Sequence, residues 1–489
     1  MATTTRYVSQ DTIPLFTNKT TNTKSISLLW GDSVQLQEPQ PATGRVKVKA
    51  RGINGYVNVD HIGDKALLEY YFIDVGQGDG VLIVTPDRKH ILIDGGYIRK
   101  KQITKRNAAD FVDWKFDRDY GKTKITLDVM MSSHNDEDHY GGLWDIINPN
   151  EVNELKLTKV EVKNFYYAGI NWFEKNGKRG LGQNKDGFWT PLLDNKTALK
   201  KYLPGGSAAG STGYSLQGQW KDFISLIVNT AGTCERLSNK RNSNGYVPGF
   251  EPKPNKPSIK VLAPIEETLD GKPALKKFTN GDDINTNGHS LLLRVDYGKT
   301  RVLLTGDLNS QSQKHILNFY QQNLSELSCD LAKACHHGSD DCSFEFLSAL
   351  SASATVISSG DNEGHNHPRP KIVAASALTG HKLIKDDRVV TPLIYSTEIA
   401  RSYKITQPEK LILDENGVHK TYNSSNKKAN LQFTSGGQVR TRNFWQSMFV
   451  SGIVYGLVNV RTDGEKILCA TMSETKREWE IETFMSRFN

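Results

Sequence analysis

The chain has 489 residues, of which 37% are hydrophobic and 24% charged, and its formal net charge is +8. This length exceeds one ordinary core, so two or three domains are expected, and the modest charge permits an anionic substrate without requiring one. No apolar run approaches the roughly 20 residues needed to cross a bilayer, and the first residues lack the apolar segment of a secretion signal. The five cysteines form no C-x-x-C pair, which argues against a disulfide framework. These features predict a cytoplasmic protein that does not enter a membrane.

Residues 1–64 predict a small β domain. Short strands are expected at 25–29, 33–37, 44–50 and 55–59, separated by glycine turns. Strands at this spacing favour a small barrel. The segment resembles the bacterial SH3-like family, including the closing Gly55, Tyr56 and Val57, and the resemblance implies a peptide or protein partner. The alternative is an irregular β extension of the next domain. Deletion through Asp64 is expected to leave a folded remainder, because the site motifs described below all follow it.

Residues 65–489 predict a second, larger domain. The stretches LLEYYFIDVGQGDGVLIV, HILIDGG and ITLDVMM are apolar strand candidates, and SIKVLAP, SLLLRVDYG and TRVLLTGDL continue the pattern. Residues 163–258 are less regular and are interpreted as an insertion with one helix at 220–228. A further helix is expected at 311–324 and a final strand pair at 453–461 and 465–472. Strands outnumber helices and the helices separate strand groups, which predicts an α+β layered sandwich.

The segment that carries chemistry is His134-Asn135-Asp136-Glu137-Asp138-His139-Tyr140-Gly141-Gly142. It follows an apolar strand candidate, so its side chains can converge without disturbing the core. Imidazole and carboxylate groups at His134, Asp136, Asp138 and His139 suit zinc and manganese alike. A bound cation would also relieve the crowding of these ionisable groups. The alternative is a solvated acidic turn with two incidental histidines.

This segment resembles the H-x-[HD]-x-D-H motif of the metallo-β-lactamase superfamily. The order of the motifs continues the resemblance, with T-G-D at 305–307, H-H-G at 336–338 and G-H-N-H-P ending at Pro368. Upstream, D-V-G-Q-G-D at 74–79 and I-L-I-D-G-G at 91–96 make the set similar to the soluble hydrolase domain of ComEC-type DNA-uptake proteins. The resemblance implies a four-layer αββα sandwich that begins near residue 65 and holds two divalent metal ions, Zn²⁺ or Mn²⁺.

The resemblance implies a specific set of metal ligands in this chain. His134 and Asp136 match ligands of the first metal, Asp138 and His139 match ligands of the second, and Asp307 matches the carboxylate that bridges both. The late histidine ligand is either His336 or His337, and the sequence does not decide between them. Many relatives have a further histidine ligand well upstream of the bridging aspartate. That histidine has no clear counterpart in this chain, because His289 is the only histidine between His139 and Asp307. The first site is therefore expected to be poorly coordinated or to depend on His289.

Several further residues are assigned supporting or catalytic roles. Asp79 is expected to orient a ligand histidine and Asp94 to cap the backbone or support a ligand. Lys333 could stabilise an anionic leaving oxygen, and His367 could order substrate or approach the metals. Ser290, in a segment similar to the N-x-x-S of the ComEC-type branch, is expected to bind substrate. Asp138 and Asp307 could also orient the nucleophile or accept its proton.

The predicted reaction is hydrolysis by a metal-activated hydroxide, most simply of a phosphodiester, as in a nuclease. The stretch 99–124 holds nine Lys or Arg residues against four Asp, with aromatic residues interleaved, a composition that suits single-stranded nucleic acid. Lys100, Lys101, Lys105 and Arg106, or the insertion, are therefore expected to steer a nucleic-acid substrate. A charged helix with its aromatic residues in the core is the alternative for this stretch. For the whole chain, the alternatives are a phosphorylcholine-esterase-like hydrolase and a recruitment or scaffold protein with a vestigial metal site.

Overall fold

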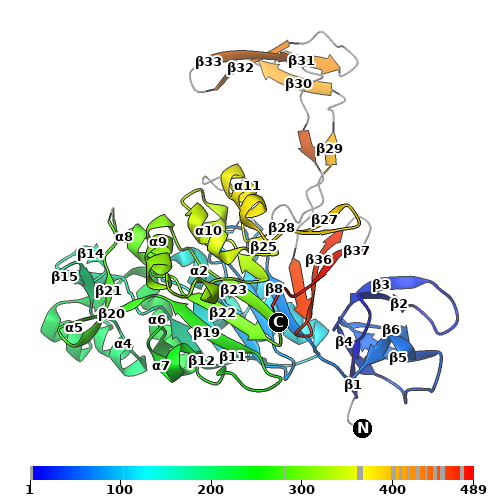
Figure 1. The fold of residues 1–489 in the computed structure, drawn as a ribbon, viewed down its shortest axis with the longest axis horizontal. Coiled ribbons are helices and arrows are strands. Elements are labelled where there is room, and N and C mark those ends of the chain that lie inside the picture. The colour runs from blue at the N-terminus through cyan, green and yellow to red at the C-terminus, as the bar shows by residue number, and fades with distance from the viewer. Residues whose placement is uncertain are drawn as a thin grey trace.

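Two large β-sheets form the centre of the molecule (Figure 1). The computed structural model describes residues 4–102, 104–279, 281–360, 367–397, 457–473 and 478–488, and the backbone of strands β29 to β34 between 404 and 451. The first sheet has nine strands, in the order β18 (Ala231–Arg236), β12 (Val160–Tyr167), β11 (Ile125–Ser132), β10 (His90–Ile93), β9 (Val81–Val84), β8 (Leu68–Phe72), β35 (Val458–Thr462), β36 (Lys466–Ser473) and β37 (Glu478–Met485). The second has six, in the order β19 (Ser258–Ala263), β22 (Leu292–Tyr297), β23 (Thr300–Leu304), β24 (Leu331–Lys333), β25 (Ala354–Ile357) and β28 (Leu393–Ser396).

The alternation of side chains along each strand explains how the sheets pack. In β9 all four residues are buried, but Val81 and Ile83 pack toward the second sheet while Leu82 and Val84 pack on the opposite face. Successive residues of a strand point to opposite faces, so an apolar run of this kind fits a strand that is covered on both sides. One hydrophobic core therefore lies between the two sheets.

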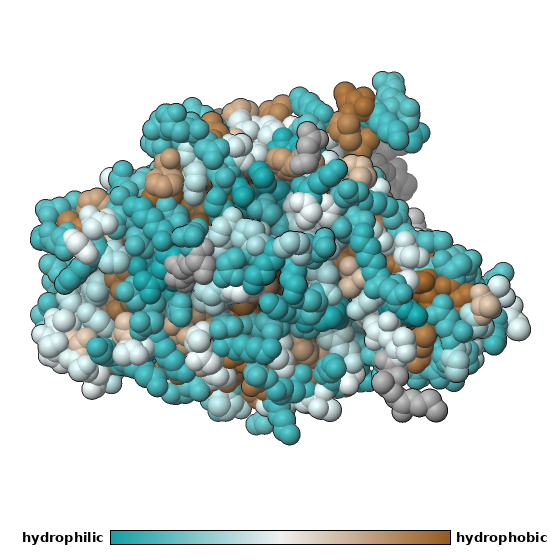
Figure 2. Space-filling model, turned by 60° about the horizontal axis from the view of Figure 1, so that its bottom comes forward, coloured by the Kyte–Doolittle hydropathy of each residue, from teal (hydrophilic) through white to brown (hydrophobic). Residues whose placement is uncertain are grey.

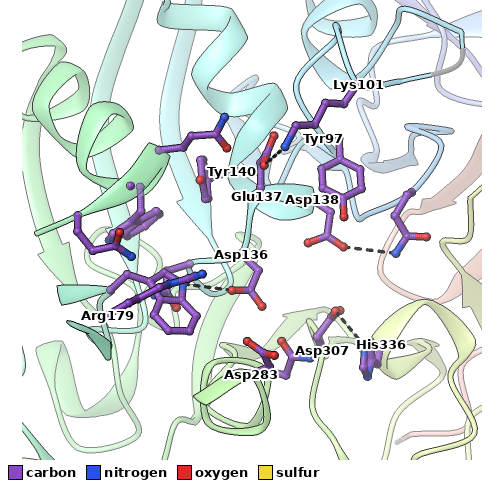
Figure 3. Close-up of a pocket in the computed structure, with 18 of the residues that line it drawn as sticks. Tyr97, Lys101, Asp136, Glu137, Asp138, Tyr140, Arg179, Asp283, Asp307 and His336 are labelled. Atoms are coloured by element: carbon purple, nitrogen blue, oxygen red, sulfur yellow. Dashed lines mark hydrogen bonds and ion pairs between the residues drawn. The ribbon is translucent and has the colours of Figure 1, made fainter. Parts of the chain in front are cut away.

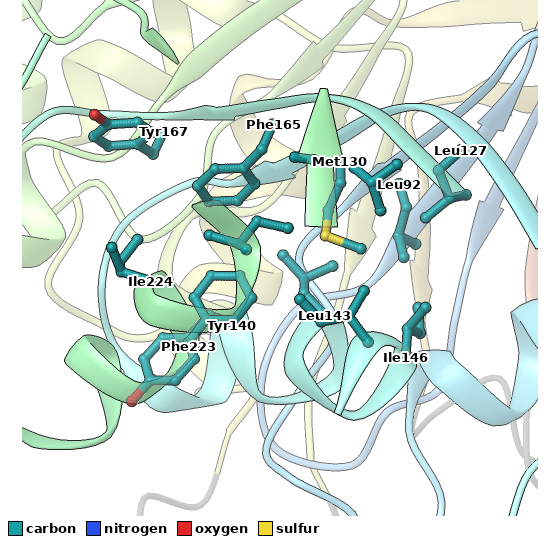
Figure 4. Close-up of a cluster of buried hydrophobic side chains, with 14 of the residues drawn as sticks. Leu92, Leu127, Met130, Tyr140, Leu143, Ile146, Phe165, Tyr167, Phe223 and Ile224 are labelled. Carbon is teal, nitrogen blue, oxygen red and sulfur yellow. The ribbon is translucent and has the colours of Figure 1, made fainter. Parts of the chain in front are cut away.

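Helices cover the outer face of each sheet. Helices α1 (Ala108–Trp114), α2 (Glu137–Ile147) and α6 (Gly218–Thr230) share a core with the nine-stranded sheet. Figure 4 shows this core, in which Leu143 and Tyr140 of α2 face Leu92 and Met130 of the strands. Helices α9 (Ser310–Phe319), α10 (Phe344–Leu350) and α11 (Pro370–Thr379) cover the six-stranded sheet in the same way. The layered α and β content expected from the sequence is present.

Glycines bring α2 close to the loops that precede it. An added methyl group at Gly142 would lie 2.0 Å from the carbonyl oxygen of Gly95, and one at Gly78 would lie 2.0 Å from that of Asp138. Only glycine permits backbones to approach so closely. The glycines of the D-V-G-Q-G-D, I-L-I-D-G-G and H-Y-G-G segments thus allow three separate loops to meet at the beginning of α2.

Residues 5–63 form a seven-stranded sheet with a hydrophobic core of its own. Its strands are β3 (Lys24–Leu29), β2 (Thr12–Phe16), β6 (Ile53–Asn58), β5 (Arg45–Ala50), β4 (Ser33–Leu36), β1 (Thr5–Val8) and β7 (Ile62–Gly63), in spatial order. The four strands predicted from the sequence are among them. Figure 1 shows this sheet beside β36 and β37, and Leu29 packs there on Leu468 and Ala470.

The region interpreted as an insertion departs from its predicted bounds. β12 runs to Tyr167 and β18 begins at Ala231, so residues inside 163–258 belong to the large sheet. The expected helix is α6. Around it lie two small sheets, one of β14 (Lys178–Gly180), β13 (Phe173–Lys175) and β17 (Ser215–Leu216), and one of β15 (Gln183–Lys185), β16 (Phe188–Thr190), β21 (Lys272–Lys276) and β20 (Glu266–Leu269). We use the term insertion below for residues 168–230. In Figure 1 these elements and the N-terminal sheet lie at opposite ends of the molecule.

The C-terminal strands complete the nine-stranded sheet. β35 pairs with β8 and β36, as the predicted final strand pair requires, although residues 452–456 of that prediction lie outside the described residues. Strands β29 to β34 pair only with one another among the described strands. Every helix in the described ranges is too short or too polar to traverse a lipid bilayer. Hydrophilic residues predominate on the face drawn in Figure 2.

Candidate metal centre

Loops that follow strands of both sheets meet at one buried group of side chains. Asp79 follows β8, His139 lies in the first turn of α2 after β11, Asp307 follows β23, and His337 follows β24. One candidate ligand atom from each of these four residues lies within 4.8 Å of the others, and all four residues are buried. The motifs that the sequence singled out therefore converge in space.

His139 is fixed from behind by Asp94. Its Nδ1 lies 2.9 Å from Asp94 Oδ2, while Asp94 Oδ1 accepts a hydrogen bond of 2.7 Å from the backbone N–H of Ser133. The Nε2 of His139 lies on the other side of the ring, 3.2 Å from Asp307 Oδ2. A carboxylate on one imidazole nitrogen can orient the other nitrogen toward a metal, and Asp94 lies in a position to do so.

Of the two candidates for the late histidine ligand, His337 lies within the buried group and closer to Asp307. Its Nε2 lies 3.0 Å from Asp307 Oδ2, and its Nδ1 lies 3.1 Å from Asp79 Oδ1. The Nε2 of the partly exposed His336 is 3.9 Å from Asp307 Oδ2. Both histidines have left-handed backbone angles, with φ of 48° and 53°. Such angles are uncommon outside glycine and are concentrated at functional sites, and here they place neighbouring side chains at different depths.

His134 and Asp136 form the second part of the group. His134 Nε2 lies 3.6 Å from Asp136 Oδ2, and its Nδ1 lies 3.3 Å from the hydroxyl oxygen of Ser290. Asp136 is held by two donors, because Trp172 Nε1 donates to Oδ1 at 3.3 Å and Thr286 Oγ1 donates to Oδ2 at 3.1 Å. The two rings of His134 and His139 are 4.0 Å apart between centroids, so the two parts of the group are adjacent.

The donor set fits divalent cations. The Nε2 atoms of His134, His139 and His337 and the Oδ1 atom of Asp307 are buried and have no hydrogen-bond partner among the described residues. Buried polar atoms without partners are costly, and a metal ion satisfies several at once. Asp138 adds a carboxylate, since its Oδ2 is 3.5 Å from His337 Nε2. The mixture of imidazole and carboxylate suits Zn²⁺ and Mn²⁺.

Asp79 lies within the group but has the position of a supporting residue. One of its oxygens faces His337 Nδ1, and the other makes a close ion pair with Lys333. Lys333 is buried, and its ammonium also donates to the carbonyl oxygen of Gly306 at 3.0 Å. Both carboxylate oxygens of Asp79 are therefore engaged by donors. Lys333 is enclosed by Asp79 and Gly306, so the expected contact with a leaving oxygen does not agree with its placement.

The charges within the group are strongly coupled. Burial alone would lower the pKa of His139 and His337, but the surrounding carboxylates, Asp307 foremost, raise both pKa values well above the ordinary range. Burial would raise the pKa of Asp138 and Asp307, but the neighbouring histidines lower both. The histidines and carboxylates thus favour each other's charged forms. A metal ion bound by these imidazole nitrogens would compete with protons for them.

A cavity of about 590 Å³ opens above the group (Figure 3). Asp136, Asp138, Asp307, His336 and His367 line it. His367 therefore lines the cavity, and Gly364 to Asn366 of its motif are outside the described residues. Residues from the insertion complete the wall, namely Trp172, Arg179, Gln217, Gly218, Gln219 and Trp220. The centre is thus accessible to a substrate from one side.

Two other residues with predicted roles at the site make contacts different from those expected. His289 Nε2 makes a hydrogen bond of 2.7 Å to the carbonyl oxygen of Lys276, and its ring stacks on Phe278, so it does not complete the first site. Ser290 is fully buried, and its hydroxyl accepts the backbone N–H of Asp307 at 3.0 Å. Ser290 therefore supports His134 and Asp307 and does not reach a substrate.

The basic residues predicted to bind substrate are mostly engaged. Lys100 pairs with Glu151 at 2.8 Å, Lys105 donates to the carbonyl oxygen of Lys100 at 2.8 Å, and Lys101, which lines the cavity, makes a close ion pair with Glu137. Arg106 lies beside a different hollow, with Trp114. The aromatic rings of Phe116 and Tyr120 pack around His90. For these two rings, the alternative of aromatic residues turned into the core is the correct one.

Sequence reasoning missed Trp172, Thr286 and Arg179. Trp172 and Thr286 hold Asp136, and Arg179 lines the cavity with its guanidinium 3.5 Å from the centre of the Trp172 indole. No motif identifies the two insertion residues. Thr286 stands just before the N-G-H-S segment, which was the available signal. Gln77, within D-V-G-Q-G-D, also donates to Asp138 Oδ2 at 3.4 Å.

Replacing Asp94 with asparagine should weaken metal binding by about 10- to 100-fold, as is usual when the partner of a ligand histidine is lost. The amide presents a donor in place of one carboxylate oxygen and removes the charge that holds Nδ1–H of His139. Titration with Zn²⁺ or Mn²⁺, followed by calorimetry, measures the change. Unchanged affinity would mean that Asp94 only caps the backbone at Ser133.

Comparison with known proteins gives short, partial matches. The ComE operon protein 3 of Bacillus subtilis (strain 168) is 27% identical over 108 residues, which is 22% of this chain and 13% of that protein. The competence protein ComA of Neisseria gonorrhoeae is 34% identical over 106 residues, which is 22% of this chain and 15% of that protein. The matched part therefore spans less than a fifth of either relative. No protein-family model matches the chain.

Among solved structures, the chain is similar to Tm1679, described as a metal-dependent hydrolase of the beta-lactamase superfamily. The sequence identity is 12% and the TM-score 0.31, and the likeness covers 68% of this chain and 95% of that chain. A likeness at this level does not decide the function.

Proposed function

We propose that this chain is a metal-dependent hydrolase of the metallo-β-lactamase type, similar to the ComEC branch, and that it cleaves phosphodiester bonds. The observation that carries the proposal is the convergence of buried histidines and carboxylates with unsatisfied ligand atoms beneath an open cavity. The motif order and the partial identity to two competence proteins support the branch. The helix-covered pair of sheets is consistent with the four-layer αββα sandwich of that superfamily.

The donor set supports a proposal of two ion positions. Asp138, His139, His337 and Asp307 would hold one ion, and His134, Asp136 and Asp307 the other, with Asp307 shared. Divalent ions bound there would lower the pKa of water and neutralise charge that develops on an attacked phosphate. The position formed by His134, Asp136 and Asp307 has fewer protein ligands, because His289 does not reach it. It is therefore expected to bind its ion more weakly.

The chain's own residues hold and shape the site. Asp94 and Asp79 keep the Nδ1–H groups of His139 and His337 in place, so that their Nε2 atoms point to the ions. Lys333 keeps Asp79 charged, since its ammonium lowers the pKa of that buried carboxyl against the effect of burial. His336 and His367 line the cavity and are positioned to hydrogen-bond a substrate oxygen. Asp138 and Asp307 are the carboxylates available to take up a proton.

Nucleic acid is the proposed substrate class, and an SH3-like role for the N-terminal sheet is proposed with it. The cavity is lined mainly by polar and charged residues, which suits a phosphodiester chain better than an apolar ester. The N-terminal sheet has its own core and includes the four strands expected from the sequence, and a peptide segment is its proposed partner.

The direct test is metal content followed by activity. Purified protein should contain up to two transition-metal ions per chain, and it should hydrolyse bis-p-nitrophenyl phosphate and single-stranded DNA when Mn²⁺ is added. EDTA should remove both activities. A metal-free protein that is indifferent to EDTA would overturn the proposal, and cleavage of carboxylic esters alone would replace the phosphodiester by another substrate.

A further inference from the structure

Arg179 is a cation at the mouth of the metal centre. It lies in the short strand β14, and the insertion that carries it also supplies Trp172, Gln217 and Gln219 to the cavity wall. In Figure 3, Arg179 lies on the opposite side of the view from Lys101 and Tyr97, with Asp136 and Asp138 between them. The insertion therefore places a guanidinium across the cavity from the basic stretch that the sequence singled out.

The environment of Arg179 leaves its charge available. Only two lysine or arginine side chains in the described residues line the cavity, and Lys101 is paired with Glu137. The Arg179 side chain is exposed and forms neither an ion pair nor a hydrogen bond with any described residue. Its guanidinium rests on the Trp172 ring at 3.5 Å, a contact that fixes the group while leaving its edge N–H donors free.

Trp172 sets the distance between Arg179 and the metal group. One side of the indole donates through Nε1 to Asp136, and its face carries the guanidinium. The same indole ring therefore contacts both Arg179 and a candidate ligand, and both residues line one cavity. This arrangement places the guanidinium beside the metal group, where it can contact an anionic group next to the one held there.

The charges around the cavity favour an anion only when the metals are present. Five carboxylates line it, from Asp136, Glu137, Asp138, Asp283 and Asp307, against the two cations Lys101 and Arg179. Two divalent ions would change this net charge from −3 to +1. The amino end of α6, a helix of 13 residues, lines the same wall with Gly218 and Gln219 and adds partial positive charge there. A substrate with two neighbouring phosphates would match this arrangement.

We infer that Arg179 is a substrate-positioning residue that binds a second phosphate of a phosphodiester chain, next to the phosphate under attack. The inference rests on the proposed phosphodiesterase function and adds to it, because it predicts a preference for polynucleotides over simple diesters. It also assigns the binding of a substrate phosphate to Arg179 of the insertion instead of Lys100, Lys101 and Lys105. Arginine suits that role because its planar fork can engage phosphate oxygens in a bidentate manner.

The test compares Arg179→Gln with Lys178→Gln. Lys178 is the adjacent exposed residue of β14, and its side chain points to the other face of the strand, so the control removes an equal charge. With metal-loaded protein and a short fluorescein-labelled oligothymidylate, Arg179→Gln should weaken binding by about 10- to 100-fold, the usual range for a charge-assisted hydrogen bond. The dependence of binding on salt should fall by about one phosphate contact. Arg179→Lys should recover part of the affinity.

Kinetics separate this role from a structural one. For oligothymidylate, Arg179→Gln should raise KM with little change in kcat, and hydrolysis of bis-p-nitrophenyl phosphate should stay within about twofold of the parent, since that diester has no second phosphate. Equal losses on both substrates, or equal losses of binding in Lys178→Gln, would overturn the inference. If the parent protein cleaves neither substrate, the proposed function fails. The binding comparison then still decides whether Arg179 holds a phosphate.

Discussion

Replacing Asp307 with asparagine should abolish metal-dependent hydrolysis and remove most of the bound metal. Asp307 Oδ2 lies 3.2 Å from His139 Nε2 and 3.0 Å from His337 Nε2, and its Oδ1 is buried without a hydrogen-bond partner among the described residues. It is the carboxylate that we propose is shared by the two ions. Loss of this shared ligand should reduce activity on bis-p-nitrophenyl phosphate by more than the roughly 100-fold expected for a residue that only supports a ligand. Elemental analysis and initial rates measure the two effects.

Asp330→Asn provides the matched control. Asp330 is also a buried aspartate at the edge of the six-stranded sheet, but it is bonded to the backbone N–H groups of Arg301 and Arg487 and is not part of the centre. The control should keep its metal and its rate once its thermal stability is shown to allow folding. A fully active Asp307→Asn protein, or equal losses of metal in both variants, would show that Asp307 is not a ligand.

The first part of the site was predictable because its residues are close in sequence. His134 and Asp136 lie in the loop between β11 and α2, and Asp138 and His139 lie in the first turn of α2. A strand followed directly by a helix determines where such a segment points. The choice between His336 and His337 was not predictable, because it depends on two left-handed backbone conformations that the sequence does not specify. The burial of individual polar side chains was equally unpredictable. Ser290 and Lys333 are polar residues next to motifs, and only the packing shows that both are buried.

Most of the structure of the region 163–258 could not be predicted from the sequence pattern. β18 has a polar, weakly alternating sequence, and it falls within the region 163–258 that the sequence predicts to be irregular. Hydrogen bonds to β12 make it the edge strand of the large sheet. Trp172 and Arg179 form no recognisable motif, and their positions follow from the tertiary fold of small sheets around α6. Strands such as β9, with apolar residues on both faces, were predictable because burial on both sides leaves a clear signal.

The contact between the N-terminal sheet and the C-terminal strands joins residues more than 400 positions apart, and no local pattern indicates it. Arg461 of β35 is fully buried, with Nη2 2.8 Å from Asp32 Oδ1 and Nη1 donating to the carbonyl oxygen of Leu29 at 3.3 Å. Arg51 pairs with Asp32 Oδ2 at 2.9 Å and lies over the Trp479 ring. Deletion of residues 1–64 would remove the partner of a buried charge and expose Leu468 and Ala470. We therefore expect that truncated protein to be much less stable than the sequence suggested.

Replacing Asp32 with asparagine should lower the free energy of unfolding by about 3 to 5 kcal/mol, because it leaves the buried Arg461 without its counter-ion. Burial opposes the charge on Asp32, but Arg461 and Arg51 outweigh it and hold its pKa below the ordinary range. A lowered pKa in the folded state stabilises the protein above the unfolded-state pKa of about 3.9, and this contribution is lost as the pH falls through the folded-state value. The difference between parent and variant in urea unfolding should therefore be largest near neutral pH and shrink below about pH 4.

Asp11→Asn is the control, since Asp11 pairs with Lys466 across the same contact but on the surface, and such pairs contribute about 0 to 1 kcal/mol. Equal, small losses in both variants would mean that the N-terminal sheet is attached loosely and can be removed as a separate domain.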